Sequence, residues 1–312
     1  MNPLTRTIYN NIHPASFLIS IGAVMAGLTA AVLRGGMSLF PAILTILFAV
    51  LLQVSANLYH GYFDMIYSGG DNLVTDADGR DLRAHAAARI RLIRVVANGF
   101  GILAVTAGLP LFTFIGWIGI AYILVILIIL FFYLAGPKAL VRSQWGIIVT
   151  FVLFGPIAVS GTALIQECGD SNWFPIFVYS LVSGLMACNA YISIMCQFYN
   201  EDLCNGKRTL IVVKGYGFVR WLYLFNSAIV ALILFVRPCV NDNVNSWLGV
   251  IMGTAVFVSS LVVVRFMKGD PAEMVRRIQV TTRIQYIGVM ILFLVTTMIA
   301  TDSFRFNILH LI

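Results

Sequence analysis

The chain has 312 residues, of which 60% are hydrophobic and only 11% are charged. A soluble domain carries about 25% charged residues, so this composition excludes an ordinary soluble protein and predicts an integral membrane protein surrounded by a lipid bilayer. The net charge of +7 does not indicate nucleic-acid binding, because the basic residues are spread over several loops between apolar segments.

Uncharged stretches long enough to cross a bilayer, which takes about 20 residues of helix, follow one another along the chain. They cover residues 15–33, 35–63, 95–137, 143–166, 171–200, 221–236, 243–264 and 284–301. The third stretch is too long for one crossing, and we expect it to turn between Pro110 and Gly116. The sequence therefore predicts an all-α fold: a single domain over residues 1–312, with nine transmembrane helices around a central cavity.

Lysine and arginine are distributed unevenly between the two sides of this predicted bundle. With the N-terminus inside, all 20 Lys and Arg residues except Arg34, Arg237 and Arg305 fall on the inner side. Because cytoplasmic loops are enriched in Lys and Arg, we predict a cytoplasmic N-terminus. The expected location is a bacterial inner membrane, with the acidic loops described next on the cytoplasmic side.

A polar stripe runs along the inner end of the second predicted span. Its members are Gln53, Asn57, His60 and Asp64. Spacings of four, three and four residues place them on one face of a helix, and Asp71 follows after two glycines. Such a stripe is costly at the end of an apolar span unless it faces a bundle interior or a cavity, so it is a candidate functional site.

A second polar stripe approaches the same membrane face from the sixth predicted span. Its members, four residues apart, are Asn189, Ser193, Gln197 and Glu201. Asp202 follows directly, and Lys207 and Arg208 come after a turn. Carboxylates from two inner loops can therefore converge beside cations, which suits a polyphosphate held through Mg²⁺. Solvated loop charges are the alternative interpretation, above all for Asp76 and Asp78.

The five cysteines have no metal-ligand spacing. Cys188 and Cys196 lie inside an apolar span and are expected to pack in the core. Cys168 and Cys239 fall in two predicted outer loops, where they either form a disulfide in an oxidising compartment or stay free thiols.

These segments resemble the UbiA-type intramembrane prenyltransferases, and most closely the menaquinone branch, the 1,4-dihydroxy-2-naphthoate polyprenyltransferases. The most specific match is Gly-Lys-Arg-Thr-Leu at 206–210, which follows Asp202 at that branch's spacing. Residues 57–64 resemble its Asn-Leu-x-Asn-Asp-Tyr-x-Asp, and residues 133–137 its Tyr-x-x-Gly-Pro. The chain departs from the pattern at His60-Gly61, where the branch has Asn-Asp, and at Phe198, where it has the first aspartate of the second motif.

The resemblance implies transfer of a polyprenyl group from its diphosphate to an aromatic quinone precursor, through Mg²⁺-assisted departure of diphosphate and an allyl cation. The metal ligands that it implies are Asp64, Asp71, Asp202 and Glu201. The implied catalytic residues are Asp64, Asp202, Asn57 and Tyr133. The implied substrate-binding residues are Lys207, Arg208, Gln53, His60, Asn189, Gln197, Lys138 and Arg142.

Several of these roles have a structural alternative. Asn57 either binds substrate and orients Asp64 or forms an interhelical hydrogen bond. His60 either acts as a base toward a phenolic acceptor or packs at the membrane interface. Tyr133 would offer an aromatic face to the departing allyl cation.

Two other functions remain open for the whole chain. A non-catalytic homologue that binds isoprenoid lipid or quinone is favoured by the incomplete aspartate motifs. A transporter would explain polar residues inside the membrane, but both stripes end at one face instead of meeting at the midplane.

Overall fold

The computed structural model describes residues 8–9, 11–68, 82–166, 172–240, 244–267 and 272–300. Over these ranges the chain is helical and has no β-strand. Asp71, Asp76, Asp78 and Cys168, and with Cys168 the predicted choice between a disulfide and free thiols, lie outside the described residues.

The helices follow the predicted spans in chain order. The long ones are α2 (Phe17–Leu33), α3 (Leu39–Ser68), α4 (Leu82–Gly108), α6 (Trp117–Leu134), α9 (Phe174–Gln197), α11 (Leu210–Val240), α12 (Val244–Phe266) and α13 (Ala272–Ala300). The fifth predicted span consists of α7 (Gly146–Val152), the π-helical η4 (Leu153–Ile157) and α8 (Ala158–Ile165). In the described part of the chain, seven helices are long and apolar enough to cross a membrane, while Phe17–Leu33 and Gly249–Arg265 are apolar but shorter.

The long third stretch turns where the sequence predicts. After α4 come the 3₁₀ turn η2 (Leu109–Leu111), which contains Pro110, and the short helix α5 (Phe112–Ile115). Gly116 then takes φ +58°, a conformation that glycine adopts without steric cost, and α6 starts at the next residue.

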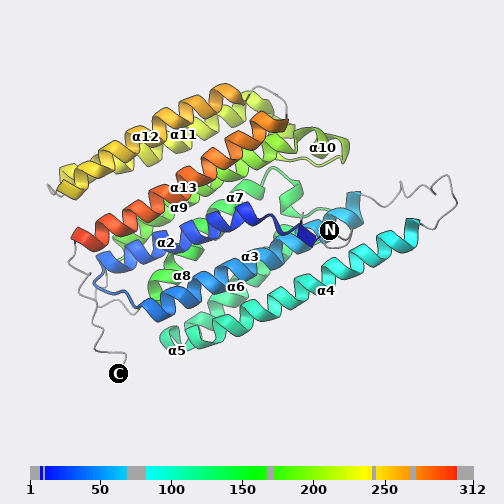
Figure 1. The fold of residues 1–312 in the computed structure, drawn as a ribbon, viewed down its shortest axis with the longest axis horizontal. Helices are drawn as coiled ribbons and strands as arrows, with labels where there is room; N and C mark the ends of the chain where they lie inside the picture. The colour runs from blue at the N-terminus through cyan, green and yellow to red at the C-terminus, as the bar shows by residue number, and fades with distance from the viewer. Residues whose placement is uncertain are drawn as a thin grey trace.

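Figure 1 shows how the helices are arranged. α11 and α12 pair along one edge, α9 and α13 pack beside them, α2 lies in the middle, and α3 with α4 forms the opposite edge. Exposed apolar side chains cover the outer faces of α4 and α6, including Ile102, Trp117 and Phe131. In a soluble protein such a surface would aggregate, whereas in a membrane it contacts acyl chains.

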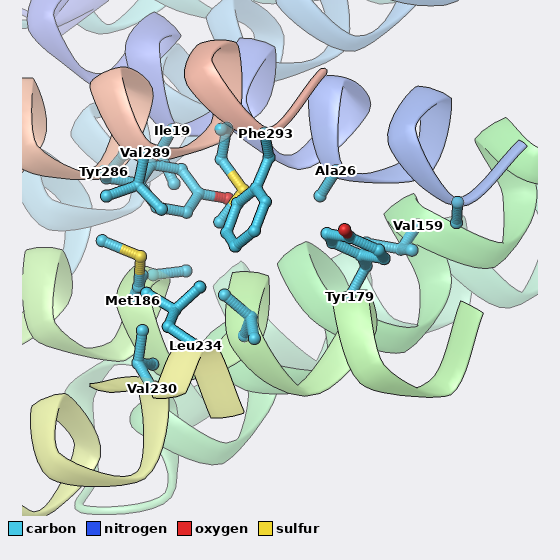
Figure 2. Close-up of a cluster of buried hydrophobic side chains, with 14 of the residues drawn as sticks. Ile19, Ala26, Val159, Tyr179, Met186, Val230, Leu234, Tyr286, Val289 and Phe293 are labelled. Carbon is cyan, nitrogen blue, oxygen red and sulfur yellow. The ribbon is translucent and has the colours of Figure 1, made fainter. Parts of the chain in front are cut away.

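The central core joins α2, α8, α9, α11, α12 and α13, and Figure 2 shows part of it. The rings of Tyr179 and Phe293 meet edge to face with their centroids 5.4 Å apart. The Tyr286 hydroxyl lies 2.7 Å from Ser183 Oγ, so its polar end is satisfied inside the core. Fully buried alanines along α2, among them Ala26 and Ala30, let the helix backbones approach closely, as small residues do between membrane helices.

The π-helical segment η4 seats α7 and α8 against α9. Pro156 interrupts the helical hydrogen bonds there, and the Ser183 hydroxyl of α9 donates to the Phe154 carbonyl at 2.6 Å. Gly155 is required by the close approach, since a Cβ at this position would lie 2.6 Å from the Ser180 carbonyl oxygen. The Ser183 hydroxyl and the close backbone approach at Gly155 therefore hold η4 against α9.

Candidate functional site

Asp64 and Asp202 come from helices far apart in the chain and meet at one ammonium group. Lys207 Nζ lies 3.1 Å from Asp64 Oδ2 and 3.2 Å from Asp202 Oδ1. The side chains of Lys207 and Asp202 are 9% and 8% exposed, and that of Asp64 is 26% exposed. Because both contacts share one nitrogen, the two carboxylates belong to a single, largely buried site.

Arg142 closes the other side of Asp64. Its Nη2 donates to Asp64 Oδ1 at 2.8 Å and to the Phe63 carbonyl at 2.9 Å. The guanidinium also lies over the ring of Tyr67, 5.1 Å from the centroid. His60 Nδ1 is 3.4 Å from Asp64 Oδ2, one helical turn away on α3. Asp64 is thus held between two cations and an imidazole.

Asp202 lies on the short helix α10 (Tyr199–Cys204) and is buried. Burial raises the pKa of Asp202 above its ordinary value, while the nearby Lys207 ammonium and the Thr209 hydroxyl, which donates at 3.4 Å, act in the opposite direction. The cation beside it therefore offsets part of the cost of keeping this carboxylate charged.

A helix-ending turn places Lys207 against Asp202. Gly206 has φ +65°, its N–H donates to the Leu203 carbonyl at 3.2 Å, and the Lys207 N–H donates to the Asp202 carbonyl at 2.9 Å. These two bonds form a Schellman motif, which ends α10 and reverses the chain. The Asn-Gly pair at 205–206 is the local reason that the lysine returns to the aspartate.

A backbone contact joins this turn to the loop that carries Arg142. The Arg208 N–H donates to the Arg142 carbonyl at 2.9 Å, and Ser143 forms a parallel bridge with Arg208. The loops α6–α7 and α10–α11 are therefore docked together, and both cations approach Asp64 from this docked pair.

Replacing Gly206 by alanine should disturb both the turn and the site. A non-glycine residue in the left-handed region costs about 1–2 kcal/mol, although the added Cβ meets no neighbour within 4 Å. We expect thermal unfolding in detergent to show a stability loss of this size, together with a higher KM for a prenyl diphosphate. Asn205→Ala is the control, since Asn205 is exposed and has φ −82°, which alanine adopts without strain. Equal losses of stability and equal KM values in the two variants would contradict the role given to the turn.

The α3 stripe is tied to the N-terminal strap, which is described at residues 8–9 and 11–16. Asn57 Nδ2 donates to the Ile12 carbonyl at 2.8 Å and to Ser16 Oγ at 2.7 Å. Gln53 Nε2 donates to Asn57 Oδ1 at 2.9 Å, and Gln53 Oε1 accepts from Ser20 Oγ at 3.1 Å. The amides of Gln53 and Asn57 thus hold the strap and α2 against α3.

The strap also fills the position at which this chain departs from the family pattern. A Cβ on Gly61 would lie 1.9 Å from Oδ1 of Asn11, so a larger side chain there would collide with the strap. An aspartate at this position, which the resemblance leads one to expect, would therefore require the Asn11 side chain to move.

The remaining predicted residues are divided between the site and its surroundings. Tyr133 is hydrogen-bonded to Tyr191 and Thr150, and the charge of Asp202 acts on Tyr191, so Tyr133 lies one residue away from the second aspartate. Asn189 is buried in the core, where it donates to Ser227 Oγ at 2.9 Å and accepts from Asn226 at 3.0 Å. The side chains that are exposed and contact neither aspartate are Gln197, Glu201, Lys138 and Arg208.

The site also includes residues that the sequence did not single out. Thr209 was visible inside the 206–210 match, and Tyr67 lies one turn beyond Asp64 on α3.

The carboxylates fit one mode of Mg²⁺ binding. Among the described residues, no group of three His, Cys, Asp or Glu side chains is arranged to hold a metal ion. Mg²⁺, however, is commonly bound through one or two carboxylates and completes its shell with water and substrate phosphate oxygens. Asp64 and Asp202 supply that minimal donor set, with the Lys207 ammonium between them.

An apolar cavity opens beside the stripe. Its empty space, including the open side, is about 1010 Å³, and its walls come from α2, α3, α5, α6, η4 and α8. Val24, Phe48, Ile126 and Ala158 are typical of the lining. Gln53 is one of the few polar residues in the wall, and eleven residues of helix, about 16 Å, separate it from Asp64. One face of α3 thus contributes Gln53 to the cavity wall and Asp64 to the carboxylate site.

Residues 20–279 match the model of the UbiA prenyltransferase family. No curated protein matches the sequence closely enough to count as a relative. The fold is similar to that of a UbiA homologue from Archaeoglobus fulgidus bound to GPP and Mg²⁺ (13% identity, TM-score 0.63, 95% of this chain and 99% of that chain).

Two other solved structures have a similar fold. One concerns a digeranylgeranylglyceryl phosphate synthase (15% identity, TM-score 0.59, 94% of this chain and 98% of that chain). The other is a UbiA homologue from Aeropyrum pernix K1 without ligand (13% identity, TM-score 0.58, 87% and 96%). At these identities the likeness concerns the fold alone. The family match covers most of the chain, and the protein therefore belongs to the UbiA prenyltransferase family.

Proposed function

We propose that this protein transfers a polyprenyl group from its diphosphate to an aromatic quinone precursor, as the menaquinone branch of the family does. The observation that carries the proposal is the convergence of Asp64 and Asp202 on Lys207, with Arg142 on the far side of Asp64. Carboxylates and cations together are what a prenyl diphosphate requires at its charged end, and an apolar cavity opens further along the same helix α3. We place this end on the cytoplasmic side of a bacterial inner membrane.

In this proposal the chain's own residues bind and orient the diphosphate. Lys207 and Arg142 donate charge-assisted hydrogen bonds to its oxygens, which are stronger than neutral ones. A Mg²⁺ ion held by Asp64 and Asp202 would neutralise the charge that develops on the leaving diphosphate. Thr209 and the Schellman turn hold Asp202 and Lys207 next to each other. The ring of Tyr67 packs against the guanidinium of Arg142.

The transfer itself breaks one bond and forms another. The bond between the first prenyl carbon and the diphosphate oxygen breaks, its electron pair leaves with the diphosphate, and an allyl cation remains. A ring carbon of the acceptor then attacks this cation and loses its proton. Aromatic faces near the site, among them Tyr133, stabilise the cation and exclude water, and His60 is positioned to take a proton from a phenolic hydroxyl.

The apolar cavity is assigned to the isoprenoid tail. It has an open side, so a long chain can extend toward lipid. Its walls are formed by aliphatic and aromatic side chains, which gain free energy by burying the methyl and methylene groups of the tail.

Narrowing the cavity should change the preferred chain length. Ala158→Phe adds a ring to the wall, and we expect at least a roughly 10-fold loss in kcat/KM for a long polyprenyl diphosphate, with little change for geranyl diphosphate. The matched control is Ile148→Phe on the exposed face of α7. An equal loss for both donors in Ala158→Phe would contradict the assignment of the cavity to the tail.

The proposed function is tested directly by diphosphate release. Purified protein in neutral detergent is incubated with a prenyl diphosphate, 1,4-dihydroxy-2-naphthoate and Mg²⁺. We expect release that depends on both the acceptor and the metal, together with a prenylated aromatic product. Absence of release with any aromatic acceptor would reject the enzymatic proposal.

A non-catalytic role in binding isoprenoid lipid is the second candidate. It is favoured by one observation: among the described residues, no three His, Cys, Asp or Glu side chains are grouped to hold a metal ion. The two carboxylates that face each other, Asp64 and Asp202, form ion pairs with Lys207 instead. In that case the release assay would show no turnover, while a separate equilibrium measurement would show saturable binding of a prenyl diphosphate.

A further inference from the structure

A second, smaller pocket lies where the two docked loops meet. Its empty space, including the open side, is about 470 Å³. It shares no lining residue with the apolar cavity, and neither the aspartates nor the cations of the carboxylate site line it. It is therefore a separate site. Its walls are formed by Ser143, Gln144 and Trp145 of the α6–α7 loop and by Arg208 and Val213 at the start of α11.

The pocket carries a positive charge. Arg208 is the one charged residue in its wall, and the Arg208 side chain is exposed. The ion pairs within the described part of the chain use His60, Arg142 and Lys207, and none of them uses Arg208. Gln144 adds an amide group with two donor hydrogens. This wall suits an anion, and a guanidinium can bind two phosphate oxygens through parallel hydrogen bonds.

The backbone around the pocket is held by hydrogen bonds of its own. The Arg208 N–H donates to the Arg142 carbonyl at 2.9 Å, which fixes the two walls next to each other. In the α6–α7 loop, Ser143 Oγ donates to the Leu140 carbonyl at 2.8 Å and accepts from the Trp145 N–H at 3.2 Å. Because the walls are already ordered, a ligand loses little affinity to ordering of the chain.

Exposed apolar side chains adjoin the pocket. Trp145 directly precedes α7, which begins the candidate span Gly146–Ile165, and α11 begins the candidate span Leu210–Val236. The pocket thus lies where two spans meet their polar loops, the level of the lipid headgroups, at which tryptophan is enriched. The side chains of Trp145, Ile148 and Val213 are 55%, 51% and 42% exposed, so acyl chains can lie against them.

We propose that this pocket binds the phosphate of an anionic phospholipid. Arg208 holds the phosphate oxygens, and Trp145 and Val213 contact the glycerol and the first part of the acyl chains. One cation matches the single negative charge of a phosphatidylglycerol headgroup, whereas a zwitterionic headgroup brings an ammonium for which the wall has no carboxylate. The site goes beyond the transfer reaction, and it gives Arg208 a role other than the substrate binding that the resemblance implies.

A bound headgroup would join the two loops that supply the cations of the carboxylate site. It contacts both walls at once, and Arg142 and Lys207, which bind Asp64, are the chain neighbours of Ser143 and Arg208. A ligand that binds only the folded protein stabilises it by mass action. Anionic lipid is therefore expected to raise the temperature of unfolding.

Lipid binding in neutral detergent tests this site without requiring turnover. The probes are a short-chain phosphatidylglycerol, a phosphatidylcholine with the same acyl chains, and inorganic phosphate, each titrated into the full-length delipidated protein and followed by native mass spectrometry and thermal unfolding. We expect the wild-type protein to bind the phosphatidylglycerol at least about fivefold more tightly than the phosphatidylcholine, the contribution of one cation near a membrane surface.

Three variants locate the preference within the molecule. Arg208→Gln should remove both the preference for phosphatidylglycerol and the rise in unfolding temperature. Trp145→Ala should weaken the binding of both lipids, because the indole contacts the part that they share. Arg265→Gln, at an exposed position of α12, removes the same charge elsewhere and should keep the wild-type preference.

The assignment is overturned if the wild-type protein binds the two lipids equally, or if Arg208→Gln keeps the preference. Inorganic phosphate that binds as tightly as phosphatidylglycerol, with the same dependence on Arg208, would make the pocket a site for a free anion and would also overturn it. A loss of prenyl diphosphate analogue binding in lipid-free Arg208→Gln would assign Arg208 to the donor instead. A lipid preference that depends on Arg208 supports the site even where no prenyl transfer is detected.

Discussion

Replacing either Asp64 or Asp202 by asparagine is expected to reduce kcat for prenyl transfer by at least about 100-fold. Removing one group that stabilises developing charge in an active site commonly costs this much. The amide keeps the size of the carboxylate but removes the charge that Lys207 contacts on both sides. The measurement is diphosphate release at saturating donor and acceptor, with thermal unfolding recorded on the same samples.

Glu201→Gln provides the contrast for this experiment. Glu201 precedes Asp202 in the chain, but its side chain is exposed whereas Asp202 is buried. We expect less than a threefold change in kcat for this variant. Unchanged turnover in both aspartate variants would refute the two-carboxylate site. A Glu201 effect as large as that of Asp202 would show that the exposed carboxylate also takes part in catalysis, which would contradict the role given to the buried one alone.

Replacing Lys207 by methionine is expected to weaken both donor binding and the fold. Two carboxylates would then share a mostly buried space without the cation between them. Breaking a buried ion pair by removing one partner costs about 3–5 kcal/mol, and we expect the low end of this range because Asp64 is partly exposed. The measurements are thermal unfolding and affinity for a prenyl diphosphate analogue, with exposed Lys214→Met as the control.

The stability deficit of the Lys207 variant should depend on pH. Burial already raises the pKa of Asp202, and removal of the opposing ammonium raises it further. When the pKa of a carboxyl is higher in the folded than in the unfolded protein, the free energy of unfolding decreases as the pH rises through the folded pKa. We therefore expect the deficit to shrink as the pH is lowered from 7.5 toward 5 in the presence of EDTA. A deficit that stays constant over this interval would mean that repulsion between the carboxylates is not its cause.

Most of the architecture can be predicted from the sequence, because a membrane imposes a local rule. A segment must be apolar over its own length to cross the bilayer, so each span is visible without knowledge of its neighbours. The turn at Pro110 and Gly116 was predictable for the same reason, since its signals lie in the turn itself. Seven of the nine predicted spans meet the criteria of length and hydropathy within the described residues, and Phe17–Leu33 and Gly249–Arg265 are shorter.

The site could be predicted only in part, because helical phase does not continue through a break. Counting every fourth residue from Asn189 leads to Glu201, but α9 ends at Gln197 and α10 starts at Tyr199. The change in direction at Phe198 leaves Glu201 exposed and buries Asp202. Asn189, at the other end of the same stripe, faces Asn226 of α11 instead of the mouth of the bundle.

The sequence by itself determined the all-helical membrane fold, the family and the two acidic motifs, since these depend on composition and short-range spacing. Only the tertiary structure decided that Lys207 lies between Asp64 and Asp202 and that Asn11 fills the space beside Gly61. The physical reason is that each of these contacts joins segments distant in the chain. Their distances depend on how helices pack, and no local pattern of residues records that.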